Sequence, residues 1–107
     1  RWYDFALLET EMAFGYVVAQ INVTDPETYA GYIKLVLPTI QHFEGEFLVR
    51  GGKSISYEGE PHGSRMVVIR FPSYQAAQDW YHSDEYAEAK AIRMSASTSV
   101  QTIIEGL

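Results

Sequence analysis

Hydrophobic and polar residues recur along this chain with two different periods, which separate the strands it predicts from the helices. Alternation with a period of two runs from Phe14 to Val23 and predicts a strand with one wholly apolar face and one mixed face. Apolar residues at spacings of three and four then run from Tyr29 to Phe43, the pattern of an amphipathic helix. The change of period predicts a strand followed directly by a helix.

Helix-start signals lie between those two patterns. Thr24 and Glu27 fit a capping box, whereas Asp25 and Pro26 fit a cap followed by proline at the first helical position. The two alternatives place the start of the helix within one residue of each other. Pro38 is expected to kink or loosen the last turns of that helix.

The middle of the chain indicates further strands. Residues 46–50 predict a short strand, the glycines at 51 and 52 a bend or bulge, and residues 54–58 its continuation or a hairpin arm. The loop 59–64 closes this hairpin. Residues 65–71 predict a third strand, apolar on both faces at its centre and therefore central in the sheet.

A second helical region and a last strand complete the pattern. Ser73 caps a helix after Pro72, and Ser83 with the two acids that follow it restarts the helix. A Ser/Thr-rich turn at 95–99 then leads to a strand at 100–104. The order β-α-β-β-α-β matches the ferredoxin-like split unit, an α+β fold with a four-stranded antiparallel sheet and helices on one face.

Such a sheet leaves its other face uncovered. That face would carry Tyr16, Val18, Val49, Val68 or their neighbours, because period alone does not say which alternating set faces the helices. An exposed apolar patch of this size is typical of an interface. We therefore expect two copies to pair face to face as a homodimer.

Length and composition narrow the class of protein. At 107 residues we expect one domain over 12–107, with 1–11 as an extension that is a passive appendage or a short docking helix. No apolar run approaches the roughly 18 residues of a membrane helix, and a net charge of −6 argues against nucleic acid. The lack of cysteine excludes disulfides and thiolate metal sites. Without an export signal, we expect a cytoplasmic protein.

Several short segments carry a more specific signal. They are Thr24-Asp25-Pro26-Glu27-x-Tyr29, Phe47-Leu48-Val49-Arg50-Gly51-Gly52-Lys53, Glu58-Gly59, Phe71-Pro72-Ser73, Trp80-Tyr81-His82-Ser83-x-Glu85-Tyr86 and Arg93. Over residues 12–107 the chain thereby resembles domain-of-unknown-function family 1330 of the dimeric α+β barrel superfamily. The resemblance implies a homodimer whose two sheets form a barrel, with a pocket between sheet and helices in each subunit. Its relatives include cofactor-free monooxygenases, haem-degrading enzymes, muconolactone isomerase and plain ligand binders, so the fold selects no reaction.

The candidate catalytic residues are His82 and Tyr81. His82 lies at a helix junction, where an imidazole can serve as a general base or an orienting donor, or can simply interact with the helix end. Tyr81 or Tyr86 could donate a hydrogen bond to a developing oxyanion. Trp80, by contrast, is expected in the core.

The candidate ligand-binding residues are mostly charged. Arg50 at a strand end can hold a carboxylate in a bidentate manner while Gly51 allows close approach, or it can pair with Glu58 across the hairpin. Charged residues beside buried elements are candidates for a pocket or for buried ion pairs. The full set is Arg50, Gly51, Glu58, Arg65, Ser83, Tyr86 and Arg93. Ser83 is also explained as a helix cap.

Two functions fit these residues. The first is a homodimeric enzyme without a bound cofactor that moves a proton on a small carboxylate or carbonyl compound, with His82 as the acid or base and Arg50 as the anion anchor. The alternative is a non-catalytic dimeric module that binds a small molecule. A haem-binding or monooxygenase-like role, with His82 as axial ligand and Asn22 opposite, is a minor alternative. No metal site is expected.

Overall fold

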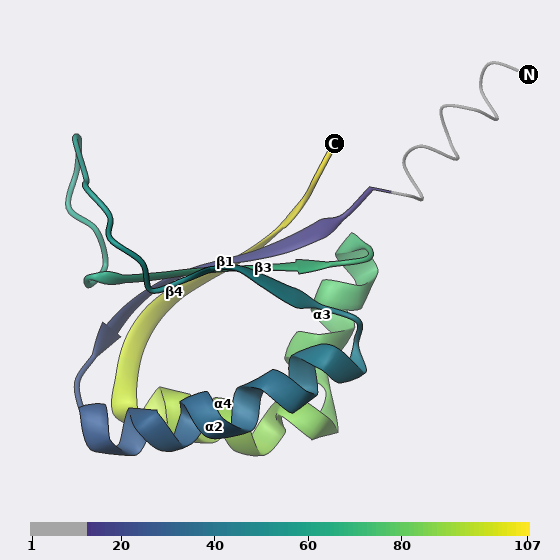
Figure 1. Ribbon diagram of the computed structural model, residues 1–107, viewed down its shortest axis with the longest axis horizontal. Helices are drawn as coiled ribbons and strands as arrows, with labels where there is room; N and C mark the ends of the chain where they lie inside the picture. The colour runs from purple at the N-terminus through teal and green to yellow at the C-terminus, as the bar shows by residue number, and fades with distance from the viewer. Residues whose placement is uncertain (1–12) are drawn as a thin grey trace, which may run out of the picture.

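The computed structural model describes residues 13–107, which form one layer of sheet and one layer of helices (Figure 1). The elements are β1 (Gly15–Val23), α2 (Pro26–His42), β2 (Glu46–Arg50), β3 (Arg65–Phe71), α3 (Tyr74–His82), α4 (Asp84–Ala96) and β4 (Ser97–Glu105). The predicted α+β order is confirmed, with the second helix in two pieces. The expected extension at 1–11 lies outside the described residues.

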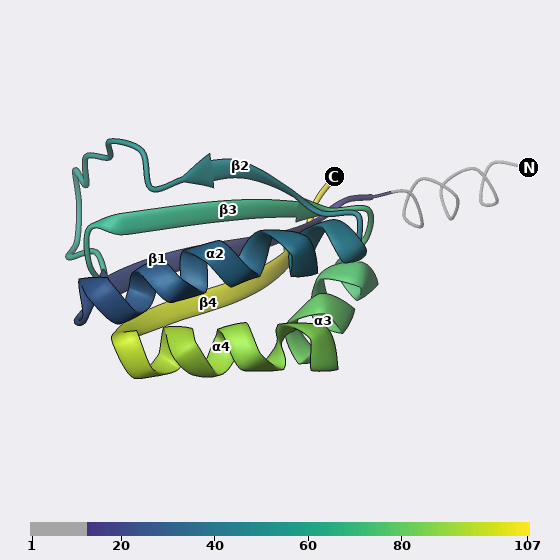
Figure 2. The same cartoon turned by 60° about the horizontal axis from the view of Figure 1, so that its bottom comes forward.

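The four strands form an antiparallel sheet in the order β2-β3-β1-β4. This is the strand order of the ferredoxin-like fold, and it places β3 inside the sheet, as its apolar centre predicts. Helices α2, α3 and α4 all cover the same face, and the other face carries no element of the described chain (Figures 1 and 2).

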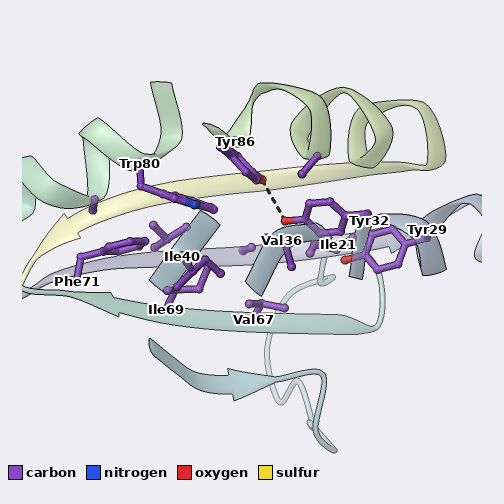
Figure 3. Packing of buried hydrophobic residues seen from close by; sticks show 14 of the residues in the cluster. Ile21, Tyr29, Tyr32, Val36, Ile40, Val67, Ile69, Phe71, Trp80 and Tyr86 are labelled. Atoms are coloured by element: carbon purple, nitrogen blue, oxygen red, sulfur yellow. Dashed lines mark hydrogen bonds between the residues drawn. The ribbon is translucent and has the colours of Figure 1, made fainter. Parts of the chain in front are cut away.

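The core lies between the helices and the sheet, and aromatic rings make up much of it (Figure 3). Trp80 is 1% exposed and stacks on Tyr86 with ring centroids 4.1 Å apart, while Phe71 lies 5.3 Å from the same indole. The expected core position of Trp80 is therefore confirmed. The remaining large buried side chains are Val17, Ile21, Tyr29, Tyr32, Val36, Ile40, Val67 and Ile69.

The structure decides which alternating set faces the helices. Val17 and Ile21 of β1 are buried beneath them, so Tyr16 and Val18 lie on the uncovered face, together with Val68 of β3 and the exposed Val49 of β2. The predicted patch is present on that face.

Helix α2 begins as one of the two cap alternatives predicts. The Asp25 side chain accepts a hydrogen bond from the Thr28 N–H at 3.2 Å, and Pro26 occupies the first helical position. The helix continues through Pro38 to His42, so the predicted loosening does not end it early.

Two sequence-based boundaries are wrong. Residues 54–58 form no strand, because Gly51 turns the chain away with a φ of 71°, and the loop 51–64 rises on the side of the sheet away from the helices (Figure 1). The predicted turn at 95–99 is absent, since α4 runs to Ala96 and β4 starts at Ser97. The Ala96 carbonyl accepts the N–H groups of Thr24 and Asp25, which satisfies this helix end without a turn.

Candidate functional site

A buried arginine is the most unusual feature of the covered side of the sheet. Arg93, in the last turn of α4, is only 2% exposed. Its Nε donates to the Tyr86 hydroxyl at 3.2 Å, one Nη donates to Ser99 Oγ at 2.8 Å, and the other approaches the Tyr81 hydroxyl at 3.5 Å. All three partners are hydroxyl oxygens, so the guanidinium is held by uncharged groups.

No carboxylate neutralises this charge within residues 13–107. The ion pairs there join Arg70 to Glu46 and His42 to Glu85, both away from Arg93. A buried charge costs several kcal/mol unless it is paired and fully hydrogen-bonded. Arg93 uses three of its five N–H groups on the hydroxyls and therefore keeps donors for a further acceptor.

The hydroxyl of Tyr86 continues the network into the core. It lies 3.0 Å from the Tyr32 hydroxyl, and Figure 3 shows the two side chains pointing toward each other from α4 and α2. Because Tyr86 accepts from Arg93, its own proton is free to be donated to Tyr32. Burial, reinforced by Tyr86, raises the pKa of Tyr32 far above its ordinary value, so this hydroxyl stays protonated.

The tyrosines also keep Arg93 charged. Burial acts to lower the pKa of Arg93, but the oxygen atoms of Tyr86, Tyr32 and Tyr81 act in the opposite direction, and the pKa is raised overall. A permanently charged guanidinium surrounded by neutral acceptors is suited to bind an anion.

Arg93 lies at a groove beside the edge strand β4. One hollow of about 380 Å³ is lined by Arg93 and Tyr81 together with Met94, Ser97, Thr98, Ser99 and Gln101. A second hollow of about 310 Å³ is lined by Tyr74, Gln78, Tyr81, His82, Gln101 and Ile103. Tyr81 and Gln101 line both hollows, so the two are neighbouring parts of one groove, which we call the Arg93 groove. Each part has the size of a small-molecule site.

The candidate catalytic residues both reach this groove. Tyr81 lies between its two hollows, half-buried, while His82 is an exposed residue at the end of α3 that lines the second hollow only. The ring of His82 lies edge-on to Tyr81 with centroids 5.4 Å apart. The two side chains therefore share one groove with Arg93, although His82 stands at its rim.

Three other candidates lie elsewhere. Ser83 caps α4 by accepting from the Tyr86 N–H, and its hydroxyl donates to the Trp80 carbonyl, so both polar functions serve the helix junction. Glu58 is exposed in the loop 51–64, and among the described residues it forms no ion pair with Arg50, contrary to that alternative. Asn22 lies on the uncovered face, across the sheet from His82, which excludes their joint haem ligation.

The arginines at 50 and 65 form a separate group. Together with Tyr29 they line a narrow cavity between α2 and the sheet, at the end of the sheet where β2 stops and β3 starts. The sequence-based set of ligand residues is therefore divided between two places, and Gln101 is the residue that lines both the cavity and the Arg93 groove.

Sequence reasoning missed part of the Arg93 groove. The sequence pattern predicts Ser97 and Ser99 in a turn and Gln101 in a plain strand, yet in the structure Ser99 binds Arg93 and receives a hydrogen bond from Gln101 at 3.1 Å. The signal was the Ser/Thr-rich stretch itself, because small hydroxyl side chains on an edge strand can approach a buried cation. Residues 13–107 contain no group of three or more His, Asp or Glu side chains placed to bind a metal, and no helix there could span a bilayer.

Solved structures show the same architecture. A protein of unknown function from Rhodopseudomonas palustris aligns with a TM-score of 0.73 at 18% identity, covering 100% of this chain and 94% of that one. SnoaB, a cofactor-independent oxygenase from Streptomyces nogalater, aligns with a TM-score of 0.59 at 10% identity, covering 86% and 91% of the two chains. At such identities the likeness concerns the fold alone.

A third structural neighbour and the sequence comparisons complete this result. A protein from Caulobacter crescentus, provisionally named an antibiotic biosynthesis monooxygenase, aligns with a TM-score of 0.57 at 17% identity over 96% of this chain and 98% of that one. No curated protein matches the chain. The model of the family described as Domain of unknown function (DUF1330) matches residues 14–107. The chain therefore belongs to this family, as its motifs had indicated.

Proposed function

We propose that this protein is a homodimeric module that binds a small organic anion, a carboxylate above all, in the Arg93 groove. The observation that carries the proposal is the buried guanidinium of Arg93, whose partners in the described chain are all hydroxyl oxygens. A carboxylate beside Arg93 would supply the missing counter-charge and accept its remaining N–H donors.

The lining of the groove supports a small and partly apolar ligand. Ser97, Ser99 and Gln101 supply polar groups on β4, while Met94 and Ile103 supply apolar surface at the two ends. A few polar groups that fix orientation within a mixed lining are typical of small-molecule sites. A carboxylic acid with a short carbon skeleton meets these conditions.

Pairing of two copies through the uncovered sheet face is part of the proposal. Val49 and Ile104 on this face are 42% and 54% exposed, and Ile55 and Tyr57 on the loop 51–64 are 76% and 89% exposed. The loop rises on the same side as that face (Figure 1). A second copy would cover these apolar side chains and leave the Arg93 groove open, because the groove lies on the helix side.

Proton-transfer catalysis is the second candidate, favoured by the presence of Tyr81 and His82 in the same groove. In this reaction His82 would take a proton from the carbon next to the ligand's carbonyl group, and the electrons of that C–H bond would form an enolate. Arg93 and Tyr81 would stabilise the negative oxygen, and return of the proton to the other carbon face or to oxygen would complete the step.

Titration calorimetry with pyruvate tests the binding function, with acetone as the uncharged analogue. We expect pyruvate to bind and acetone not to bind. Arg93→Gln should weaken pyruvate binding by about tenfold or more, because a hydrogen bond to a charged group contributes roughly 1.5–3 kcal/mol. The matched control is Arg70→Gln, which removes an arginine of the uncovered face and should leave pyruvate binding unchanged.

A second variant tests the site even if the Arg93→Gln protein does not fold. Ser99→Asp places a carboxylate where a hydroxyl now contacts Arg93, so it should preserve the fold and abolish pyruvate binding by occupying the guanidinium. Unaltered pyruvate affinity in a folded Ser99→Asp variant would contradict the proposed site.

Deuterium exchange separates binding from catalysis. In D₂O an enzyme of the proposed kind would replace the methyl protons of pyruvate with deuterium, a loss that proton NMR records directly. His82→Gln should then stop exchange while calorimetric binding remains. A protein that binds pyruvate without any exchange is the binding module alone.

A further inference from the structure

The Arg93 groove changes in character along the edge strand β4. Its first hollow lies beside α4 and its second beside α3, and these two helices follow one another along β4 (Figure 2). Ser99, Gln101 and Ile103 all lie on the covered face of β4, because each pairs with a buried residue of β1. This row of side chains passes from a hydroxyl through an amide to an apolar group.

The polar end of the groove offers hydrogen-bond donors around Arg93. Ser99 Oγ accepts from an Arg93 Nη at 2.8 Å and from Gln101 Nε2 at 3.1 Å, which occupies both of its lone pairs. The Ser99 proton has no acceptor among the described residues, so it can be donated to a ligand in the first hollow. The Tyr81 hydroxyl, which Arg93 approaches at 3.5 Å, keeps its proton in the same way. The first hollow is therefore suited to a carboxylate.

The other end of the groove is apolar and aromatic. The second hollow is lined by the side chains of Tyr74, Tyr81 and Ile103, with Gln78 and His82 among its polar members. Tyr74 is 41% exposed, and within residues 13–107 its ring pairs with no other aromatic ring. Aromatic side chains gain from offset or edge-on contact with a second ring. An aromatic group of a ligand would find such contact in the second hollow.

The geometry of β4 sets the distance between the two ends. A strand rises about 3.4 Å per residue, so Gln101 lies about 7 Å beyond Ser99. Gln101 lines both hollows and therefore marks their boundary. A ligand with its carboxylate at Ser99 needs a chain of this length to bring a ring to the second hollow. Three methylene groups followed by a benzene ring span the distance.

We infer that the ligand of the Arg93 groove is an arylalkanoate, a carboxylate joined through a short alkyl chain to an aromatic ring. This inference rests on the proposed function and extends it to the second hollow. The carboxylate lies beside Arg93 and Ser99. The chain passes Gln101, and the ring lies against Tyr74 and Ile103. Pyruvate, by contrast, occupies the first hollow only.

Titration calorimetry with 4-phenylbutyrate and butyrate measures what the ring adds. The two acids share the carboxylate and the alkyl chain and differ in the ring. Because the ring is buried in the second hollow, 4-phenylbutyrate should bind about tenfold or more tightly than butyrate. The uncharged analogue 4-phenylbutan-1-ol should bind about tenfold or more weakly than the acid, because it lacks the charge that Arg93 recognises.

Tyr74→Ala tests the second hollow, because it removes one of the two tyrosine rings at an exposed position. The affinity for 4-phenylbutyrate relative to butyrate should fall by about threefold or more. Both affinities are measured in the same variant, so a general loss of folded protein does not change their ratio. The matched control is Tyr57→Ala on the loop 51–64, which is 89% exposed and should keep the ratio of the parent protein.

Nuclear Overhauser contacts locate the ring without any substitution. In isotope-labelled protein, the ring protons of 4-phenylbutyrate should contact the methyl groups of Ile103, which lines the second hollow and not the first. Met94 lines the first hollow and not the second. Ring contacts to the Met94 methyl group in place of Ile103 would overturn the inference.

The outcomes separate this inference from the proposed function. Equal affinities for 4-phenylbutyrate and butyrate, or an unchanged ratio in Tyr74→Ala, would overturn the aryl site and leave pyruvate binding at Arg93 intact. Pyruvate and butyrate affinities that Arg93→Gln does not lower would overturn the proposed function, and the inference with it.

Discussion

At the scale of single residues, the hydroxyl of Tyr86 occupies a junction. It accepts from Arg93 Nε and lies within hydrogen-bond distance of the Tyr32 hydroxyl, while its ring stacks on Trp80. One atom thus joins the charged groove to the neutral core. The sequence predicts Tyr86 as a ligand-binding residue. In the structure Tyr86 does not line the Arg93 groove but contacts Arg93, which does.

Tyr86→Phe should therefore cost stability out of proportion to the single atom it removes. It leaves the buried Arg93 Nε and Tyr32 hydroxyl without this partner, and an unsatisfied buried polar group costs roughly 1–3 kcal/mol. Urea unfolding measures the loss. Tyr81→Phe is the matched control, since its longer contact of 3.5 Å with Arg93 is part-buried, and its cost should be clearly smaller. An equal loss of unfolding free energy in the two variants would contradict this role of the Tyr86 hydroxyl.

At the scale of elements, the helix starts follow from local polar chemistry. The caps at Asp25, Ser73 and Ser83 were readable because a short polar side chain at a helix start accepts backbone N–H groups. The end of α4 was not readable, because it depends on a distant contact: the Ala96 carbonyl is satisfied by Thr24 and Asp25. The β-bulge in β2, where the pairing with β3 shifts between Phe47 and Val49, also depends on the neighbouring strand, which no local pattern reveals.

Ser83→Ala tests whether that serine serves the fold or the ligand. Its hydroxyl accepts from the Tyr86 N–H and donates to the Trp80 carbonyl. The substitution should lower the free energy of unfolding by about 1 kcal/mol and leave pyruvate affinity unchanged. Ser73→Ala, which removes the corresponding cap of α3, should have a comparable effect. A loss of affinity with full stability would return Ser83 to the ligand-binding set.

At the scale of the whole molecule, the sequence predicted the layers and the family but not the site. The alternation of apolar and polar residues predicts the strands and the uncovered face of the sheet, because alternation is a local property of the sequence. The division of the arginines between a groove and a cavity depends on which strands are neighbours, and on the bulge that turns Arg50 toward the helices. The candidate residues were thus recognisable by type, and their grouping required the fold.

Val68→Lys tests the proposed pairing through the uncovered face. Val68 lies at the centre of that face on β3, and a lysine there would bury an unpaired charge in the interface. Since such burial costs several kcal/mol, the dissociation constant of the dimer should rise by about a hundredfold or more. Light scattering coupled to size exclusion measures the change, from dimer to monomer. Leu35→Lys on α2, which is 40% exposed on the helix side, is the control and should remain dimeric. A monomeric parent protein would contradict the pairing itself.

The central claim is that Arg93 binds an organic anion, and a crystal structure of the protein grown with pyruvate tests it most directly. The account predicts the carboxylate beside the Arg93 guanidinium, between α4 and β4, with its oxygens within about 3 Å of the Nη atoms. Pyruvate found only at Arg50 and Arg65, or an Arg93 groove that holds water alone at saturating pyruvate, would contradict the claim.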